Sequence, residues 1–521
     1  MQAYTVIKEC KVNSDPYSLF CELSKDLEDA VLLESKDGNG KNNIASMLFL
    51  KTALRFEAFK NRVIITILTE NGKKALSAVK SELEKIALFS PLADGAEVIF
   101  KSELAEGDDI ARIKSIYPGD VIRIFANRWN LGTDNINKRL SLPGVFSYDF
   151  LDSFEKLPEA KDDTLNFPDY IFYLPEESVI VDHEKHLASV IIHGYDATSY
   201  DEQYKSDSKR AEELAGFVES IKESHEVAYN KVGSFDMNLD AKSDMSDREY
   251  ADLVIKMKTH IVKGDVFQIV PSRTFLADCD NSLKTYGVLR QLNPSPYLFY
   301  MKHKDFELFG SSPETSVKVY GTPKTASIRP IAGTRRRGYL KDGTLDKDLD
   351  GRLEAELKLN EKEVAEHMML VDLARNDIAR VSKPGTRYVE KLLEVERYSH
   401  VMHLVSIVEG VLKDDLDALH AYIASANMGT LVGSPKIEAA SILRKNENDK
   451  RGPYGGAVGY ITSDGEMDTA IIIRSAIVKD GVARVRAGAG VVFDSDPMAE
   501  AAETRAKASA VLKAIAIAKE V

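Results

Sequence analysis

Apolar and polar residues alternate with two different periods along this chain, and each period predicts a different kind of element. Residues 61–87 begin with an apolar, β-branched run that predicts a strand. The pair Asn71-Gly72 then predicts a turn, and a helical pattern follows it. Residues 199–226 are rich in charge and predict an exposed helix. Strand and helix signals are therefore mixed in the first 200 residues.

A polar stretch separates this first part from the rest of the chain. Residues 234–250 are rich in Ser, Asp and Asn, which is typical of a loop. We therefore predict a linker over residues 201–245. It would divide an N-terminal domain of residues 1–200 from a second domain of residues 246–521.

The second part gives clearer helix and strand signals. Residues 248–265 predict an amphipathic helix that follows a possible cap, Ser246, and ends at Lys263-Gly264. Residues 266–275 predict one strand. Residues 306–321 predict two strands joined by a Gly/Ser turn.

Hairpin signals dominate the C-terminal region. Asp464-Gly465 and Asp480-Gly481 each lie between β-branched runs, which predicts an antiparallel meander. Strand runs joined by hairpins and interleaved with long helices are typical of α+β proteins, in which helices pack outside antiparallel sheets. We expect that fold class here.

Composition excludes several classes of function. The 521 residues are 44% hydrophobic and 29% charged, as in ordinary globular proteins. The net charge of −13 gives no electrostatic support for binding nucleic acid. No run of 18 apolar residues predicts a membrane span, and the N-terminus lacks the apolar core of a signal peptide. Three scattered cysteines suit a reducing cytoplasm, which is the location we expect.

Two pairs of glutamates are the first candidate site. Glu363 with Glu366, and Glu500 with Glu503, are each spaced i, i+3 in a helical pattern, so each pair lies on one helix face. Two such faces turned toward each other would offer oxygen ligands to a hard cation such as Mg²⁺. The alternative is that both faces are simply solvated.

Two further candidates are polar residues that lie within apolar segments. Arg474 lies in the apolar segment IIIRSA, where a charge is unfavourable unless it meets an anion or an internal ion-pair partner. His403 lies in the apolar run VMHLVS, where a hydrogen-bonded core residue is the plainer alternative. Gly-Thr and Gly-Ala-Gly segments nearby allow backbone N–H groups to approach an anion.

Short motifs then add a resemblance. They are LLES at 32–35, GDVFQ at 264–268, NPSPY at 293–297, SSPET at 311–315, PIAGT at 330–334, GTLVGSPK at 429–436 and GPYGG at 452–456. With these motifs, residues 245–515 resemble the chorismate-utilising enzyme family. The whole chain resembles the anthranilate synthase component I branch of that family. The resemblance implies chorismate as substrate and two stacked antiparallel β-sheets flanked by helices, with the site between them and an N-terminal regulatory and partner-contact domain.

The resemblance also implies roles for residues that bind metal and substrate. Glu366 and Glu503 would hold Mg²⁺, with Glu363 and Glu500 beside them or acting through water. The substrate-binding candidates are Gly333, Thr334, Thr430, Tyr454, Arg474, Gly488, Ala489, Gly490 and Lys507.

Three residues are the catalytic candidates. Glu314 would protonate the leaving C4 hydroxyl of chorismate, because burial can raise the pKa of a carboxylic acid. His403 would lie near that hydroxyl and assist the later loss of pyruvate. Gln268 stands where water-adding relatives carry a lysine, and Ala332 stands where relatives that make aminodeoxychorismate carry another. Amination at C2 to give anthranilate is therefore favoured.

Other activities stay open at this point. An aminodeoxychorismate synthase or an isochorismate or salicylate synthase is the alternative enzyme. A catalytically inactive, tryptophan-binding paralogue is the alternative without enzyme activity. Intact Glu314, His403 and the four glutamates speak against that paralogue.

Ammonia would have to come from another chain. Cys10, Cys21 and Cys279 lack the Gly-rich surroundings of a glutaminase nucleophile. The resemblance implies a separate glutamine amidotransferase subunit, component II, in a heterotetramer.

One motif lies far from all these residues. Glu34 and Ser35 of LLES resemble the family's tryptophan feedback site, which Pro296, Tyr297 and Leu298 would complete. L-Tryptophan is therefore the expected inhibitor. Without the resemblance, the same residues would read as a strand that ends in a turn.

Overall fold

The structure is a computed structural model. It describes residues 3–35, 45–101, 109–129, 140–195, 200–222, 225, 241–340, 343–398 and 401–520.

Two central strands connect two facing layers of antiparallel strands. The central strands are β3 (Ala45–Phe59) and β8 (Tyr170–Asp182), which pair with each other. The first layer runs from β3 through β2 (Ala30–Glu34), β13 (Tyr297–His303), β14 (Phe306–Ser312), β23 (Ser475–Lys479), β24 (Val482–Gly488) and β12 (Ser272–Asp278) to β10 (Lys242–Ser243). The second runs from β8 through β7 (Ser141–Phe146), β21 (Ala457–Thr462), β22 (Met467–Ile471), β15 (Thr315–Tyr320) and β16 (Thr325–Ile328) to β19 (Val401–Val411), which also pairs with β17 (Ile331–Arg336) and β18 (Tyr388–Arg397).

Shorter strands extend this framework at its edges. β4 (Arg62–Ile67), β6 (Gly95–Ile99) and β5 (Leu88–Leu92) continue from β3. β9 (Leu187–Gly194) and β1 (Tyr4–Lys11) continue from β8. A separate two-stranded ribbon joins β11 (Gln268–Ile269) to β20 (Gly433–Ser434).

An apolar core lies between the two layers. Phe299 and Ile477 of the first layer share one buried cluster with Val145, Val458 and Ala470 of the second. Alternate side chains of a strand point to opposite faces, so each layer also presents an outer face that helices cover. The predicted fold, stacked antiparallel sheets flanked by helices, is confirmed.

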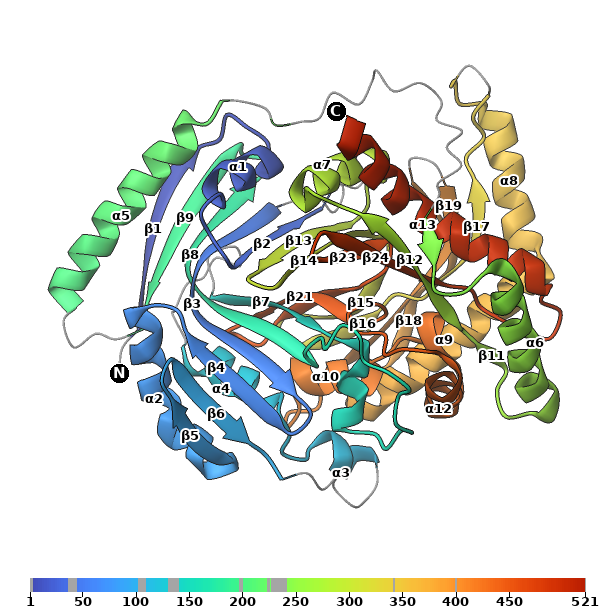
Figure 1. Ribbon diagram of the computed structural model, residues 1–521, viewed down its shortest axis with the longest axis horizontal. Coiled ribbons are helices and arrows are strands. Elements are labelled where there is room, and N and C mark those ends of the chain that lie inside the picture. The colour runs from blue at the N-terminus through green and yellow to red at the C-terminus, as the bar shows by residue number, and fades with distance from the viewer. Residues whose placement is uncertain are drawn as a thin grey trace.

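Helices cover both outer faces (Figure 1). Outside the first layer lie α1 (Pro16–Leu23), α7 (Ser282–Leu292) and α13 (Pro497–Glu520), and α5 (Tyr200–Ser220) covers β1 and β9. The other helices are α2 (Glu70–Ile86), α3 (Asp109–Ile113), α4 (Asp120–Arg128), α6 (Asp247–Lys263), α8 (Lys347–Leu359), α9 (Glu361–Val381), α10 (Ala418–Ser425), α11 (Gly429–Val432) and α12 (Lys436–Asn446), with a 3₁₀ turn at Tyr148–Ser153. In the part of the chain that the structure describes, no helix combines the length and apolarity that crossing a bilayer requires.

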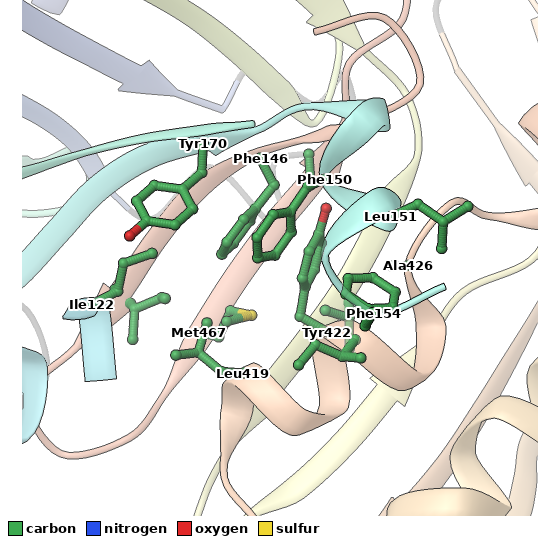
Figure 2. Close-up of a cluster of buried hydrophobic side chains, with 14 of the residues drawn as sticks. Ile122, Phe146, Phe150, Leu151, Phe154, Tyr170, Leu419, Tyr422, Ala426 and Met467 are labelled. Carbon is green, nitrogen blue, oxygen red and sulfur yellow. The ribbon is translucent and has the colours of Figure 1, made fainter. Parts of the chain in front are cut away.

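Aromatic side chains tie the N-terminal residues to the C-terminal half. Phe146 of β7 stacks on Tyr422 of α10, with ring centroids 4.1 Å apart, and on Phe150 at 5.3 Å (Figure 2). Such contacts add about 0.5–1.5 kcal/mol per pair beyond area burial. The division at residues 201–245 stays a prediction, and strands from both sides of it pair within the same layers.

The helix predicted after Ser246 is present. Ser246 and Glu249 form a capping box at the start of α6. Gly264 ends the helix with a φ of 82°, a left-handed value that glycine adopts without strain.

The turn predicted at Asn71-Gly72 is wrong, because both residues lie in the first turn of α2. Thr69 caps that helix by accepting from the Gly72 N–H, and Asn71 donates to the His193 carbonyl. A Cβ at Gly72 would stand 2.0 Å from the Ala53 carbonyl oxygen, so glycine here permits close packing of the helix on β3 rather than a turn.

Two strand predictions also need correction. The strand predicted over residues 266–275 is divided at Pro271 into β11 and β12, since proline has no N–H for the ladder. The meander predicted at the C-terminus is two separate hairpins, because β22 pairs with β15 while β23 pairs with β14. The chain therefore passes from one layer to the other between Ile471 and Ser475.

Candidate active site

A cavity of about 550 Å³ lies where this crossing meets the N-terminal ends of α9 and α13. Its wall includes every residue predicted for catalysis, metal binding or substrate binding except Ala489, together with Ala332: Gln268, Glu314, Ala332, Gly333, Thr334, Glu363, Glu366, His403, Thr430, Tyr454, Arg474, Gly488, Gly490, Glu500, Glu503 and Lys507. The structure thus brings together residues that are up to 239 positions apart in the sequence, from Gln268 to Lys507.

The four glutamates enter this cavity from two helix starts. Glu363 and Glu366 lie in the first two turns of α9, and Asn360 caps this helix by accepting from the Glu363 N–H. Glu500 and Glu503 lie in the first turns of α13. Unpaired N–H groups make a helix N-terminus partly positive, so it stabilises carboxylates placed there.

Each of three glutamates already has a partner in this structure. The Gln268 amide nitrogen donates to Glu366 at 3.0 Å. Arg335 lies 2.8 Å from Glu363, and Lys507 lies 2.6 Å from Glu503. Among the described residues, no group of three or more His, Cys, Asp or Glu side chains is arranged to hold a metal ion. Cation binding would require Glu363 and Glu503 to turn from their present partners.

Neighbouring carboxylates of this group repel one another. Burial raises the pKa of Glu366, the Gln268 amide opposes that shift, and the charges of Glu363 and Glu503 raise the pKa further. Burial also raises the pKa of Glu500, with a further contribution from Glu503. The oxygen atoms present fit a hard divalent cation.

Glu314 is a buried carboxylic acid at the turn between β14 and β15. Burial raises its pKa to about 7, and a hydrogen bond from Thr430 at 3.0 Å together with the charges of Lys507 and Arg474 limits the rise. Near neutral pH a large share of Glu314 therefore carries a proton that it can donate. Thr430, expected to bind substrate, is here bonded to the acid.

His403 of β19 faces Gly333 and Thr334 of β17. Its Nδ1 lies 3.0 Å from the Gly333 carbonyl oxygen and 3.0 Å from the Thr334 hydroxyl. A carbonyl oxygen only accepts, so Nδ1 carries the hydrogen and Nε2 is the basic atom of the neutral ring. Burial lowers the pKa of His403, which keeps the ring neutral.

Arg474 lies at the point where the chain passes between the layers. Its φ of 51° is in the left-handed region, which is unfavourable for a non-glycine residue. Burial lowers its pKa. Within the described ranges no carboxylate lies within 4.0 Å of the guanidinium, whose hydrogen bond goes to the Lys507 carbonyl at 3.5 Å. An internal ion pair therefore does not account for this charge, and an anionic ligand would.

The Gly488–Gly490 segment forms the wall beside Arg474. Lys507 donates to the Gly488 carbonyl at 3.1 Å, and a Cβ at Gly488 would lie 3.1 Å from the Tyr454 hydroxyl. A Cβ at Gly490 would stand 2.8 Å from the Gln268 amide nitrogen, so both glycines keep the cavity open. Ala489 is fully buried, and its N–H donates to the Pro271 carbonyl and the Tyr250 hydroxyl rather than into the cavity.

Comparison with known proteins identifies the family of this chain. A family model described as chorismate binding enzyme matches residues 123–513. The chain belongs to the chorismate-binding enzyme family.

Full-length relatives in this family share one name. Anthranilate synthase component 1 of Vibrio cholerae serotype O1 is 43% identical over 98% of this chain and 96% of that protein. The protein of the same name from Buchnera aphidicola subsp. Acyrthosiphon pisum is 44% identical over 98% and 96%. The crystal structure of anthranilate synthase component I from Streptococcus pneumoniae is 29% identical, with a TM-score of 0.69 over 90% of this chain and 92% of that one.

Two of the residues predicted to bind tryptophan lie side by side. β2 pairs with β13 so that Glu34 lies opposite Leu298. Glu34 is buried, accepts from the Tyr286 hydroxyl and lies 2.8 Å from Arg290. The Ser35 hydroxyl is buried and has no hydrogen-bond partner among the described residues. Pro296 is buried at the start of β13.

One residue of this segment contacts the strand that follows Glu314. The Tyr297 hydroxyl lies 3.0 Å from the Thr315 hydroxyl and donates to Asp468 at 2.9 Å. Thr315 follows Glu314 directly in the sequence. A contact of this kind between β13 and β15 depends on tertiary structure, and no local pattern indicates it.

Sequence reasoning missed three charged residues at this site, one of which is Arg486 in the cavity wall. Arg335 pairs with Glu363, and Lys362 lines the cavity. Lys362 precedes Glu363 in the same helical pattern, so the sequence could have indicated that it lies near the predicted metal site. The pairing of Arg335 depends on how β17 packs on α9, so the sequence contained no comparable signal for it.

Proposed function

We propose that this chain is the aminating component of an anthranilate synthase, a lyase that converts chorismate and ammonia to anthranilate and pyruvate. The observation that carries the proposal is one cavity containing Glu314, an acid with a pKa of about 7, and Arg474, a cation without a carboxylate partner in the described chain. The names of the full-length relatives support it.

Binding of chorismate would use the cations of the cavity. Arg474 would take the enolpyruvyl carboxylate, with Tyr454 and the glycine wall beside it. Lys507, which now contacts Glu503 and the Gly488 carbonyl, would add positive charge. The four glutamates would hold Mg²⁺, which supplies a counter-charge for the ring carboxylate.

Amination would need a proton donor and an oriented nucleophile. Ammonia attacks C2 of the ring, the two ring double bonds shift from C1=C2 and C5=C6 to C1=C6 and C4=C5, and the C4–O bond breaks as Glu314 gives its proton to the departing hydroxyl, which leaves as water. The new ammonium group then loses a proton to solvent to become the amine. The Gln268 amide, which lies beside Glu366, would orient ammonia. Ammonia in its free-base form already has a lone pair and needs no base to activate it.

Loss of pyruvate would follow. The ring loses the proton on C2, the C3–O bond breaks, and the enolpyruvyl methylene gains a proton, so the ring becomes aromatic. His403 has the basic Nε2 atom that can take part in this transfer, because Nδ1–H is held by Gly333.

Two positions favour amination over related reactions. Water must lose a proton to attack, and the Gln268 amide cannot take it. Ala332 lines the cavity with a methyl group, which cannot form a covalent adduct with C2 as a lysine could.

The first test is the nitrogen source. The isolated chain is expected to make anthranilate from chorismate, Mg²⁺ and ammonium salts at alkaline pH, but not from glutamine. EDTA is expected to abolish turnover, because the four carboxylates would then repel one another without a cation between them. Product fluorescence and mass identify anthranilate. Glutamine-dependent activity of the pure chain would contradict the need for an amidotransferase subunit.

Replacement of Gln268 by lysine tests the choice of nucleophile. Gln268→Lys is expected to lower amination and to introduce some hydration to isochorismate, since a lysine amine can deprotonate water. Chromatography of the products measures both activities. Amination at the wild-type rate in this variant would show that residue 268 does not touch the nucleophile.

We assign ammonia supply to a glutamine amidotransferase subunit, component II, in a heterotetramer working in the cytoplasm. The described chain offers no activated thiol, because burial raises the pKa of Cys10 and of Cys21 to about 11 and raises that of Cys279. The relatives' designation as component 1 supports a second component.

We assign feedback inhibition to L-tryptophan bound near Ser35 and β13. Ser35→Phe is expected to relieve inhibition while ammonia-dependent activity stays largely intact, because it replaces the buried, unpartnered hydroxyl, which would bind tryptophan, with a bulky ring that cannot hydrogen-bond. Coupling between the two sites would be about 1–3 kcal/mol. Inhibition curves for both proteins measure this. A variant as sensitive as wild type would remove Ser35 from the site.

A further inference from the structure

A buried polar bridge joins the helix that carries Glu363 and Glu366 to the strand that carries His403. His367 of α9 has no exposed surface, and its Nε2 lies 2.7 Å from the hydroxyl of Ser406 in β19. Ser406 is equally inaccessible. Neither residue lines the cavity, and the proposed reaction uses neither.

The Ser406 hydroxyl also holds a third element. It accepts from the Leu393 N–H of β18 at 3.0 Å. Leu393 has a φ of 56° and lies where the pairing of β18 with β19 shifts register between Lys391 and Glu394. Such a bulge leaves an N–H outside the regular ladder, and the Ser406 hydroxyl supplies the acceptor that this N–H would otherwise lack.

The backbone of Ser406 forms a hydrogen bond as well. Its N–H donates to the Pro330 carbonyl at 3.2 Å, just before β17 begins. A serine hydroxyl offers one hydrogen and two acceptor positions, and the bonds to Leu393 and His367 use two of these three. Ser406 therefore connects β18, the start of β17 and α9 at one point.

The hydrogen bond between His367 and Ser406 fixes the position of α9 along its axis more tightly than apolar packing does. Leu370 and Val371, one helical turn after His367 on α9, are also buried, and apolar contacts are non-directional. A helix held only by such contacts tolerates small shifts along its axis. A buried, directional bond between side chains fixes one register.

We propose that His367 is a positioning residue, which through Ser406 fixes the register of α9 on β19 and so sets the distance of the Glu363 and Glu366 carboxylates from His403. Glu366 precedes His367 directly, and Ser406 follows His403 by three residues. The inference rests on the proposed function, because it concerns the same carboxylates and the cation that they would hold.

The C-terminal half of α9 is held in a different way. Asp377 lies 2.8 Å from Lys436 of α12, and a Cβ at Gly429 would stand 2.3 Å from Leu373. These contacts keep the helix in place even when His367 is changed. Loss of the bridge should therefore shift the N-terminal turns of α9 without unfolding the protein.

The experiment uses the full chain with three variants and one control. His367→Leu and Ser406→Ala remove the bridge, and His367→Gln places an amide near the Nε2 position. Ser425→Ala is the matched control, because Ser425 is buried to the same degree but its hydroxyl bonds only carbonyls of its own helix, those of Ala421 and Tyr422.

The measured quantity is the Mg²⁺ concentration for half-maximal activation of ammonia-dependent turnover. It is expected to rise roughly 10–100-fold in His367→Leu and Ser406→Ala, as found when residues that orient metal ligands are changed. His367→Gln is expected to recover most of the loss, and Ser425→Ala to match wild type. Hydrogen exchange at the Leu393 amide should accelerate in Ser406→Ala.

A second readout does not depend on turnover. The rise in melting temperature that Mg²⁺ produces, with and without chorismate, should need correspondingly more Mg²⁺ in the two bridge-removing variants. A wild type that binds Mg²⁺ but turns over no chorismate would refute the proposed function and leave this comparison valid. Variants with a lower melting temperature but the wild-type Mg²⁺ requirement would overturn the proposal, as would a wild type that shows no response to Mg²⁺.

Discussion

Glu314→Gln is expected to lower kcat by roughly 10²–10⁴-fold while the KM for chorismate stays within a small factor. Glutamine has nearly the same shape and can keep the contact with Thr430, but it has no acidic proton to give to the leaving hydroxyl. Steady-state kinetics with ammonium salts and Mg²⁺ measure both constants.

The pH dependence provides a second signature of the same acid. The pKa of Glu314 is raised to about 7, so the protonated, active form is lost as pH rises through that value. Turnover divided by the concentration of free ammonia should therefore fall above pH 7 in wild type, and the fall should be absent in Glu314→Gln. Without that division, the gain in free ammonia at alkaline pH would mask the effect.

A second glutamate variant tests whether the effect depends on the place of Glu314 in the cavity. Glu307 of β14 is another carboxyl whose pKa burial raises, but it lies outside the cavity wall. Glu307→Gln is expected to keep the wild-type rate and pH profile. If Glu314→Gln turned over chorismate as fast as Glu307→Gln, Glu314 would not be the acid.

Arg474→Gln is expected to raise the KM for chorismate strongly. Removing one partner of a buried charge pair costs about 2–5 kcal/mol, which corresponds to roughly 30- to 5,000-fold in affinity. Initial rates over a range of chorismate concentrations measure the change.

The same variant should not lose stability. In the described, ligand-free chain, Arg474 has no carboxylate partner, so replacing it removes an unfavourable charge and breaks no ion pair. Its melting temperature is expected to equal or exceed that of wild type. The control is Arg444→Gln, because Arg444 lies 3.0 Å from Asp149 and from Asp152, and its loss should lower the melting temperature. Equal destabilisation by both variants would indicate a structural role for Arg474.

Local spacing was enough to predict part of this site. The i, i+3 glutamates fall on single helix faces because the helical period is fixed, and both helices form where the pattern indicates. The caps of α6 follow from Ser246 and Gly264 for the same local reason. The motifs and their resemblance supplied most of the remaining site residues.

Partner choice between distant segments could not be read from spacing. The signal at Asp480-Gly481 gave a hairpin, but nothing local says that β23 pairs with β14 rather than with β22. That choice moves Arg474 from the interior of a sheet to the passage between two layers. The contacts of Glu363 with Arg335 and of Ala489 with Pro271 likewise depend on tertiary packing.

The pairing of β7 with β21 has a consequence for how this chain is made. Phe146 lies opposite Ala457, so β7 leaves the ribosome on the order of 300 residues before its partner exists. At a synthesis rate of about 5–20 residues per second, the edge of β7 that pairs with β21 stays unpaired for roughly 15–60 s. Phe146, Phe150 and Tyr170 also remain without Tyr422 for most of that time. The nascent N-terminal half thus presents an unpaired apolar edge, a target for chaperones and for aggregation in a crowded cell.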